Sequence, residues 1–279
     1  MTETKIKAML AHKYDPDKAD YPAYIQPKLD GVRCLFTKDG AFSRAGNQFM
    51  NVKHIEKALE NFFNKNSTAV LDGELYNHGL KDDFEKIISL VKKKKPTDEQ
   101  RDEAAELVQY HVYDIASFAH ATYENRLSII STMLTYTYPV CKVETKVVLD
   151  HDEAVSYHRY CLKQGYEGSI YRSISGKYKG TRSWDLMKFK DFHDDEAVIV
   201  GYETGKGKRQ GTLGKFIMQD DEGNLFGCPP GKGYDYKDLA GMLDNVHDYI
   251  GQRATFTYFQ RTKAGSYRHP HYKCLRNYE

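Results

Sequence analysis

The sequence is poor in cysteine and has a single tryptophan among its 279 residues. The five cysteines are widely spread and never stand in C-x-x-C spacing, which argues against a disulfide framework or a zinc site and indicates a reducing compartment such as the cytoplasm. The 11 histidines show no metal-ligand spacing either. No apolar run approaches the roughly 20 residues that a membrane span requires, and the charged N-terminus lacks the apolar segment of a secretory signal.

The sequence also lacks an excess of charge of one sign, because it has 41 basic and 39 acidic residues and a net charge of +2. Bulk charge therefore does not indicate nucleic-acid binding. Two local groups are basic: the stretch from Arg261 to Arg276 holds five basic residues and no acidic one, and Lys206, Lys208 and Arg209 stand among glycines. Such groups can contact a phosphate backbone, although each also fits an ordinary solvated surface.

Apolar periodicity predicts an α+β chain. The Asp39-Gly40 pair predicts a hairpin within residues 21–50. Amphipathic spacing predicts helices over 52–64, 82–94, 122–134 and 152–164. Short apolar runs predict strands over 69–76, 110–117, 165–172 and 183–190, several of which we expect to end in carboxylates.

After Lys190 the sequence pattern changes. It predicts short β segments with many glycines, a weak helix near 235–248 and strands over 252–260. This pattern suits a small β-barrel that carries one helix, such as an OB-fold. We therefore expect two domains, 1–190 and 191–279, and a chain of this length can bury a core in each.

The central chemical feature is the segment Lys28-Leu29-Asp30-Gly31-Val32-Arg33. A lysine attacks phosphorus only as the free amine, so it needs a cationic or desolvated neighbourhood that lowers its pKa. Arg33 is a permanent cation five residues on, and we expect Gly31 to permit a tight turn that brings both into one pocket. Taken alone, the pattern also fits a turn with a surface lysine.

Four further pieces follow in order, and each supplies something that transfer of a nucleotide requires. Carboxylates can hold a divalent metal, lysines can neutralise phosphate, and an aromatic ring can stack on a purine. The pieces are Asp72-Gly73-Glu74, Tyr113-Asp114, Glu167-Gly168 and Lys188-Phe189-Lys190. Five pieces in this order make chance an unsatisfactory explanation.

The set KLDGVR, DGE, YD, EG and SWDLMKFK resembles motifs I, III, IIIa, IV and V of the covalent nucleotidyltransferases, which include ATP-dependent DNA ligases, RNA ligases and mRNA capping enzymes. The resemblance covers most of the chain. SRAGNQF is similar to a ligase motif that follows the nucleophile, and VGYETGKGKRQGTLGKFIM to the opening of a ligase OB domain. The chain thus resembles a minimal two-domain DNA ligase of the kind found in viruses, phages and some bacteria.

This resemblance implies a fold and a set of roles. The fold would be a nucleotidyltransferase domain with ATP-grasp-like antiparallel sheets and helices, followed by a β-barrel OB-fold domain. Lys28 would form the lysyl-adenylate, and Glu74 and Glu167 would bind metal. The nucleotide would be held by Gln26, Ile25, Arg33, Arg44, Glu74, Tyr113, Lys188, Lys190 and Arg268. DNA would be contacted by Arg44, Lys206, Lys208 and Arg209.

The resemblance also implies ATP and Mg²⁺, with Mn²⁺ as a substitute, and nicked duplex DNA as the partner. It implies a monomer that works in the cytoplasm, or in the host cytoplasm for a virus or phage, in DNA replication, repair or recombination. Arg268 and Arg276 resemble motif VI, which orients the pyrophosphate of ATP. That motif often ends R-x-D-K, whereas here Asn277-Tyr278-Glu279 follows Arg276.

Three other functions compete with the DNA ligase. An RNA ligase shares the first five motifs but usually lacks the OB domain. A capping guanylyltransferase has that domain and uses GTP, and the sequence does not separate the two nucleotides. A nucleic-acid-binding OB module with an inactive partner domain is the non-enzymatic alternative, and the intact motif residues speak against it. Trp184 is interpreted as a core residue, and the cysteines as small buried apolar residues.

Overall fold

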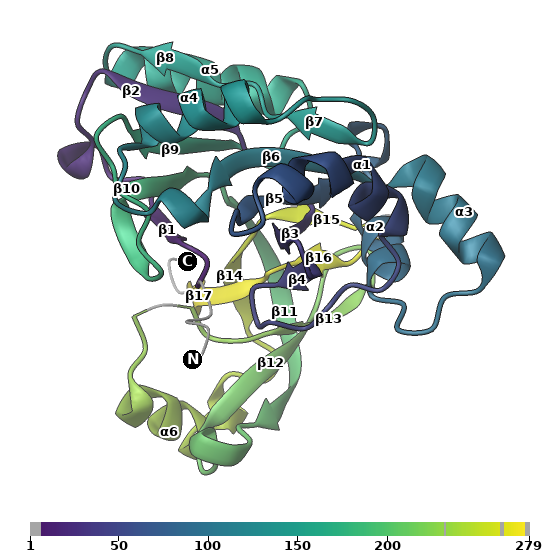
Figure 1. The fold of residues 1–279 in the computed structure, drawn as a ribbon. Helices are drawn as coiled ribbons and strands as arrows, with labels where there is room; N and C mark the ends of the chain where they lie inside the picture. Colours follow the sequence, from purple (N-terminus) through teal and green to yellow (C-terminus); the bar gives the residue numbers. More distant parts are fainter. Residues whose placement is uncertain (1–6, 232, 263–264, 277–279) are drawn as a thin grey trace. The chain divides into compact units, whose positions relative to one another are not determined.

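A computed structural model describes residues 7–231, 233–262 and 265–276 of the chain (Figure 1). The chain divides into two compact units, Met1–Lys190 and Asp191–Glu279. Each unit has its own sheets and its own buried core. Within the described residues, no helix is long and apolar enough to cross a membrane.

The first sheet of the first unit brings the start and the end of that unit together. Its strand order is β1-β10-β9-β2-β8, and only the β1–β10 pair is parallel. The strands are β1 (Leu10–Lys13), β10 (Arg182–Phe189), β9 (Ser169–Ser173), β2 (Ala23–Pro27) and β8 (Lys146–Val148). The nucleophile candidate Lys28 directly follows β2, and Glu167 precedes β9, which is the neighbour of β2.

The second sheet has the order β4-β3-β5-β6-β7, and only its β6–β7 pair is parallel. The strands are β4 (Gly40–Ser43), β3 (Val32–Thr37), β5 (Leu71–Tyr76), β6 (Gln109–Ile115) and β7 (Val140–Lys142). The β3–β4 hairpin confirms the turn predicted at Asp39-Gly40. The prediction that β5 ends in carboxylates is wrong, because Asp72 and Glu74 lie inside this strand and pair with β3 and β6.

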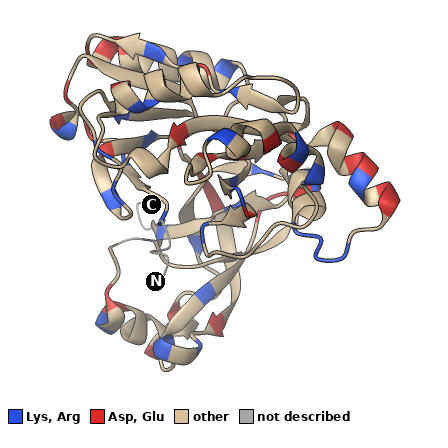
Figure 2. Cartoon of the chain, viewed as in Figure 1, with Lys and Arg blue, Asp and Glu red and all other residues tan. Residues whose placement is uncertain are grey.

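The four predicted helices of the first unit are present within two or three residues of their expected ends. They are α1 (Lys53–Lys65), α2 (Phe84–Val91), α4 (Tyr123–Met133) and α5 (His151–Lys163). A fifth helix, α3 (Asp98–Leu107), was not predicted because its ten residues include five acidic ones and bury only Ala104. A capping box at Thr97 and Gln100 starts it. Figure 2 shows the acidic residues of α3 beside the basic connection from α2.

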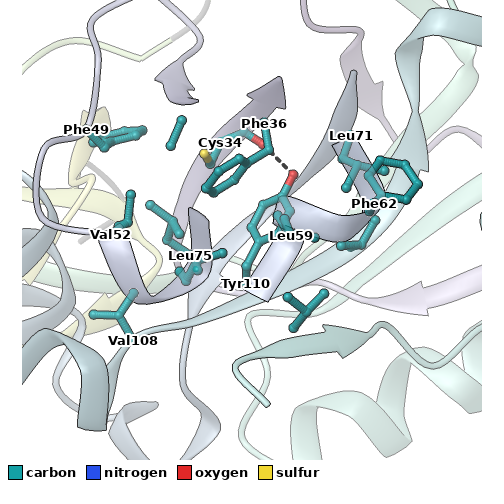
Figure 3. Packing of buried hydrophobic residues seen from close by; sticks show 14 of the residues in the cluster. Cys34, Phe36, Phe49, Val52, Leu59, Phe62, Leu71, Leu75, Val108 and Tyr110 are labelled. Carbon is teal, nitrogen blue, oxygen red and sulfur yellow. Dashed lines mark hydrogen bonds between the residues drawn. The ribbon is translucent and has the colours of Figure 1, made fainter. Parts of the chain in front are cut away.

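The larger core of the first unit lies between the second sheet and helices α1 and α2 (Figure 3). Leu59 of α1 packs there with Phe36 and Leu71, and each of these side chains is at most 1% exposed. The buried Tyr110 hydroxyl donates to the Cys34 carbonyl oxygen at 3.1 Å, so its polar atom has a partner. Truncating one such side chain to alanine costs about 2–5 kcal/mol, and this core therefore supports the strands that carry Arg33, Glu74 and Tyr113.

The second unit is built on one strongly bent sheet of order β13-β12-β11-β14-β17. Its two edges meet: Tyr272 of β17 donates from its backbone nitrogen to Pro229 O at 2.9 Å, and Gly231 N donates to Tyr272 O at 3.0 Å. The strands are β11 (His193–Thr204), β12 (Leu213–Gln219), β13 (Leu225–Cys228), β14 (Arg253–Tyr258) and β17 (His271–Leu275), with the hairpin β15 (Gln260–Arg261) and β16 (Tyr267–Arg268). Helix α6 (Tyr236–Asp244) matches the weak helix predicted there.

Short 3-10 turns complete the connections at Pro16–Lys18, His78–Leu80, Ala116–Phe118, Gly207–Arg209 and Val246–Asp248. The interpretation of Trp184 as a core residue is wrong. Its side chain is 42% exposed and stacks on His12, with ring centroids 3.8 Å apart. The β10 strand bulges at this point, because Ala11 pairs with Ser183 and His12 with Met187. The indole keeps the alternation of the strand here, since Arg182 and Trp184 are exposed and Ser183 between them is buried.

Candidate functional site

The first unit contains a cavity of about 280 Å³ in which seven of the predicted site residues meet. They come from both sheets and from the connections that follow β2 and β4. They are Gln26, Lys28, Arg33, Arg44, Glu74, Tyr113 and Lys188. The cavity is thus the meeting point of the first motifs of the sequence.

Lys28 is positioned by two backbone hydrogen bonds to the Glu167-Gly168 pair. Its amide nitrogen donates to Gly168 O at 2.9 Å, and its carbonyl oxygen accepts from Glu167 N at 3.1 Å. These bonds extend the β2–β9 pairing by one step beyond Pro27 and Ser169. Gly168 has a φ of +141°, and an added Cβ would lie 2.2 Å from Phe189 O, so only glycine fits this approach.

The carboxylate of Glu167 is shared between two lysines. Lys28 Nζ donates to its Oε2, and Lys190 Nζ donates to its Oε1 at 2.8 Å. Burial alone would raise the pKa of Glu167, but the positive charges of Lys28 and Lys190 outweigh burial and lower this pKa below its usual value. Lys190 reaches the site through this carboxylate, although it does not line the cavity.

Arg33 is held on the neighbouring wall by Asp72. Its Nε and one terminal nitrogen donate to the two carboxylate oxygens at 2.9 Å and 2.5 Å, in the paired geometry that arginine favours. The Tyr178 hydroxyl donates to the same carboxylate at 2.7 Å. Arg33 therefore supplies a fixed positive group to the cavity, and its first partner is Asp72.

Glu74 faces Lys28 and Arg33 from the middle of β5. Its carboxylate accepts from the Tyr113 hydroxyl at 3.2 Å. Burial raises the pKa of Glu74 to about 8, although the charges of Lys28 and Arg33 oppose this rise. A half-buried carboxylate of this kind gains from any cation that enters the cavity. Tyr113 itself lies under two guanidinium groups, with Arg33 Cζ 5.9 Å and Arg172 Cζ 5.1 Å from its ring centroid.

Lys188 belongs to a group of like charges on the first sheet. Its pKa is lowered, first by burial and then by the nearby cations Lys190, Lys28 and Arg182. Arg182, which the sequence analysis missed, also lines the cavity and donates to the Ala11 carbonyl oxygen of β1. Several cations around one small cavity make it a binding site for anions such as phosphate.

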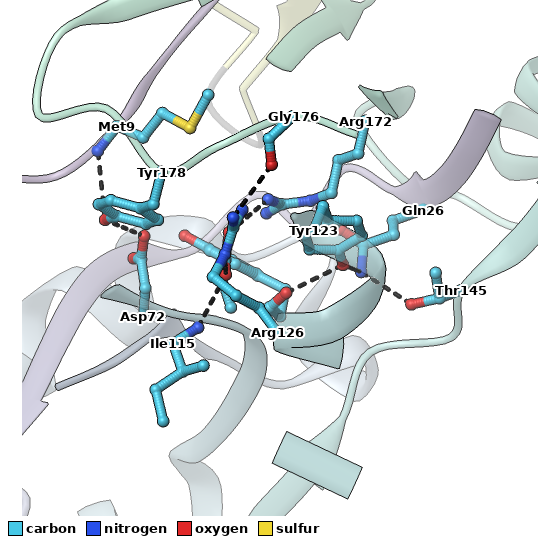
Figure 4. Close-up of polar contacts among 12 residues, drawn as sticks. Met9, Gln26, Asp72, Ile115, Tyr123, Arg126, Thr145, Arg172, Gly176 and Tyr178 are labelled. Carbon is cyan, nitrogen blue, oxygen red and sulfur yellow. Dashed lines mark hydrogen bonds and ion pairs between the residues drawn. The ribbon is translucent and has the colours of Figure 1, made fainter. Parts of the chain in front are cut away.

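Gln26 lies at the buried end of the cavity and is bonded to Arg172 (Figure 4). Arg172 was also missed, since a single arginine inside a predicted strand carries no motif. Ile25, expected beside the nucleotide, is wrong in this role: it is fully buried in a separate core cluster with Tyr171 and Met187. Gly31 lies in the bend between β2 and β3, as expected, and it also permits a close approach to β5. A Cβ there would lie 2.4 Å from the Leu75 carbonyl oxygen.

The remaining predicted residues belong to the second unit. Lys206, Lys208 and Arg209 are exposed on the connection between β11 and β12. Arg268 ends β16, with its Cζ 5.8 Å from the ring centroid of Phe259. Arg276 pairs with Glu196, and Lys263 and the segment 277–279 lie outside the described residues. Contact of these residues with a nucleotide or DNA stays a prediction.

The expected absence of disulfides and zinc ligands can be compared with the described residues only. All five cysteines are free, and Cys34, Cys161 and Cys228 are buried, whereas Cys141 is half-buried and Cys274 is exposed. Among the residues that the structure describes, no three histidine, cysteine or carboxylate side chains gather in a way that could hold a metal ion.

Comparison with known proteins covers nearly the whole chain. The family model of the ATP dependent DNA ligase domain matches residues 8–190, and that of the DNA ligase OB-like domain matches residues 204–276. The DNA ligase of Enterobacteria phage T6 is 25% identical over 88% of this chain and 62% of its own length. A DNA ligase of African swine fever virus is 27% identical over 68% of this chain and 46% of its own. The chain therefore spans only part of the length of these relatives.

Solved structures share the fold. A structure from an analysis of Lig E DNA ligases and DNA binding with a minimal scaffold has a TM-score of 0.80 at 23% identity, covering 97% of this chain and 99% of its own. The ATP complex of the bacteriophage T7 ATP-dependent DNA ligase has a TM-score of 0.56 at 17% identity, covering 98% and 99%. At these identities the likeness supports the expected nucleotidyltransferase and OB-like folds.

Proposed function

Because this chain belongs to the family of ATP-dependent DNA ligases, we propose that it seals nicks between a 5′-phosphate and a 3′-hydroxyl in duplex DNA through AMP carried on Lys28. The observation that carries this proposal is the position of Lys28 in a cavity whose walls bear Arg33, Glu74 and Lys188. The cavity places a nitrogen nucleophile beside cationic side chains that can bind the oxygens of a triphosphate.

The two units would divide the work. The first, residues 1–190, would be the adenylation domain, and the second, residues 191–279, an OB domain that binds DNA. Lys206, Lys208 and Arg209 of the second unit and Arg44 of the first would contact phosphates of the nicked duplex. The protein would act as a monomer in the cytoplasm, where its free cysteines stay reduced.

In the first step, Lys28 Nζ would pass a proton to solvent and form a bond to the α-phosphorus of ATP, while the bond to pyrophosphate breaks and pyrophosphate leaves with its electron pair. Glu167 would hold the lysine nitrogen in line before the attack, and Lys188 and Lys190 would hold the phosphate oxygens. Gln26 and Tyr113 would contact the adenine, and Arg33, Arg44 and Glu74 the ribose or phosphate. Arg268 would orient the departing pyrophosphate.

Two further displacements at phosphorus would complete sealing. The 5′-phosphate oxygen at the nick would attack the AMP phosphorus and release Lys28. The 3′-hydroxyl would then attack the activated 5′-phosphate and release AMP. One cation-lined cavity can serve all three steps, because each spreads negative charge over phosphate oxygens.

A divalent cation fits the residues present. Mg²⁺ takes one or two carboxylates together with substrate phosphates and water, and Glu74 is a half-buried carboxylate in the cavity wall whose pKa is raised to about 8. Glu74 and Glu167 would hold Mg²⁺, or Mn²⁺ in its place, and the ion would neutralise charge on the triphosphate.

The test is labelling of the protein by nucleotide. The chain is incubated with Mg²⁺ and α-labelled ATP or GTP, beside Lys28→Ala and Lys28→Arg, of which the second keeps the charge but cannot act as a free amine. Label from ATP that is lost in both variants is expected. Label from GTP alone would favour the capping reaction, and an adenylated protein that seals only RNA nicks would favour the RNA ligase. Mass spectrometry of the untreated protein detects AMP acquired during expression.

A further inference from the structure

The side-chain amide of Gln26 is held in one orientation by three neighbours (Figure 4). Its Nε2 donates to the Tyr123 hydroxyl at 2.9 Å and to Thr145 Oγ1 at 2.8 Å. Its Oε1 accepts from Arg172 Nε at 2.7 Å. Gln26 is 2% exposed, so both N–H bonds and one lone pair of the oxygen are used inside the protein.

The chemistry of these neighbours excludes the flipped amide. Arg172 can only donate, so the Gln26 atom that faces it must be the oxygen. The Tyr123 hydroxyl gives its own proton to the Tyr113 carbonyl oxygen at 3.0 Å, and Thr145 gives its proton to a nearby carbonyl oxygen at 3.2 Å. Both hydroxyl oxygens are therefore left to accept from the amide nitrogen.

Arg172 is itself fixed, so it cannot release the amide by swinging away. Another of its nitrogens donates to Asp114 at 2.9 Å, and the arginine is 5% exposed. Asp114 is 1% exposed and is also paired with Arg126 at 2.7 Å. The Arg172 guanidinium carbon lies 4.6 Å from the Tyr123 ring centroid. The orientation of Gln26 is thus the outer end of a buried network.

The oxygen end of the amide lies on the cavity side. Gln26 and Arg172 are among the described residues that line the cavity, whereas Tyr123 and Thr145 are not among them. The amide nitrogen therefore points to the protein interior. The second lone pair of Gln26 Oε1 is the acceptor that this residue offers to a ligand at this end of the cavity.

We propose that Arg172, Tyr123 and Thr145 determine base specificity by holding the Gln26 amide so that it presents an acceptor to the C6 position of a bound purine. This inference rests on the proposed nucleotide transfer. A 6-amino purine donates to Gln26 Oε1, whereas a 6-oxo purine sets one acceptor against another. The network thereby selects ATP over GTP without any contact of Tyr123 or Thr145 with the base.

The first test uses the unaltered protein and three α-labelled nucleotides. They are ATP, inosine triphosphate with a 6-oxo group, and purine riboside triphosphate with no C6 substituent. The expected order of kcat/KM for protein labelling is ATP, then the unsubstituted purine, then inosine triphosphate, with the last at least about tenfold below ATP. Equal use of ATP and inosine triphosphate would overturn the proposal, and a preference for inosine triphosphate would mean that a donor, such as Arg172, faces the base. Label from none of the three would instead tell against the proposed function.

Variants separate amide orientation from general support of the fold. Arg172→Met removes the donor that fixes the oxygen, so the labelling ratio of inosine triphosphate to ATP should rise about tenfold, while Arg172→Lys keeps a donor and the wild-type ratio. A purely structural role would lower both nucleotides alike and leave the ratio unchanged. Gln26→Met should abolish the advantage of ATP over the unsubstituted purine, and an advantage that persists would contradict the proposal even if Arg172→Met does not fold.

Discussion

Lys28 Nζ donates directly to a carboxylate oxygen of Glu167. The backbone segments of these two residues are also joined by hydrogen bonds. The side chain of Lys28 is 21% exposed and that of Glu167 is 8% exposed. The other oxygen of Glu167 accepts from Lys190. One buried carboxylate thus balances two ammonium groups, of which that of Lys28 lines the cavity.

Replacing this carboxylate should destabilise the first unit. Glu167→Gln leaves Lys28 and Lys190 without their shared negative partner, and losing one member of a buried ion pair costs about 3–5 kcal/mol. We expect the free energy of unfolding in urea at pH 7 to fall by about that amount. The control is Glu56→Gln, which breaks an exposed pair with Lys53 and should cost less than about 1 kcal/mol. Equal losses in the two variants would contradict the assignment.

Glu74 should make stability depend on pH in the opposite sense to an ordinary paired carboxylate. Its pKa in the folded chain is raised to about 8 from an ordinary 4.5, first by burial. The stabilisation from its bound proton is complete below about pH 4.5 and is lost as pH rises through about 8. Between these limits the free energy of unfolding of wild type should fall relative to Glu74→Gln, by at most about 1.4 kcal/mol per pH unit.

Chemical denaturation at several pH values from 5 to 9 measures this difference. Glu60→Gln, at an exposed glutamate of α1, is the matched control and should leave the pH profile parallel to wild type. If the Glu74→Gln and wild-type curves are parallel as well, the carboxyl is not protonated in the folded chain. Addition of Mg²⁺ with nucleotide should reduce the difference if the ion binds Glu74.

Gly168→Ala should disrupt the approach of β10 to the Lys28 segment. The added Cβ would lie 2.2 Å from Phe189 O, and the φ of +141° is unfavourable for alanine. We expect a loss of about 3 kcal/mol in thermal or urea unfolding. Gly241→Ala in α6 is the control: it meets no atom within 4 Å, so it should be stabilising by up to about 1 kcal/mol. A neutral Gly168→Ala would show that β10 can shift without cost.

Charge reversal at Lys206 and Lys208 should weaken binding of nicked duplex DNA. Both side chains are exposed on the β11–β12 connection. Loss of two phosphate contacts should reduce the slope of log affinity against log salt by about 2. The matched control reverses Lys57 and Lys65 on α1, which changes net charge equally. Nick affinity that is unchanged across salt in the Lys206 and Lys208 variant, or lowered as much in the control, would remove these residues from the DNA surface.

Motif order predicted the cavity wall well, because Lys28, Glu74, Tyr113 and Lys188 each lie on or beside a strand that reaches the cavity. Arg172 and Arg182 were missed because their positions at the cavity depend on which strands pair. Strand order cannot be predicted from the local pattern of apolar residues. The 3.6-residue pattern predicted α1 but not α3, since α3 buries almost nothing. The Thr97–Gln100 capping box was the signal that could have indicated it.

Two interpretations failed for reasons of packing. Trp184 lies within a bulge that no sequence rule locates. Ile25 and Gln26 alternate across β2, so only one of them can face the cavity. Alternation alone could have made that choice, had the buried face of β2 been known.

The pairing of β1 with β10 has a consequence for folding during synthesis. Ala11 and Arg182, whose contact closes one side of the cavity, are 171 positions apart in the sequence. A chain emerging from a ribosome presents Lys28 early, but its phosphate-binding wall is absent until residues 182–190 have also emerged and folded back. Unfinished chains therefore lack the complete cavity, and under the proposed function they should not react with ATP while synthesis is still under way.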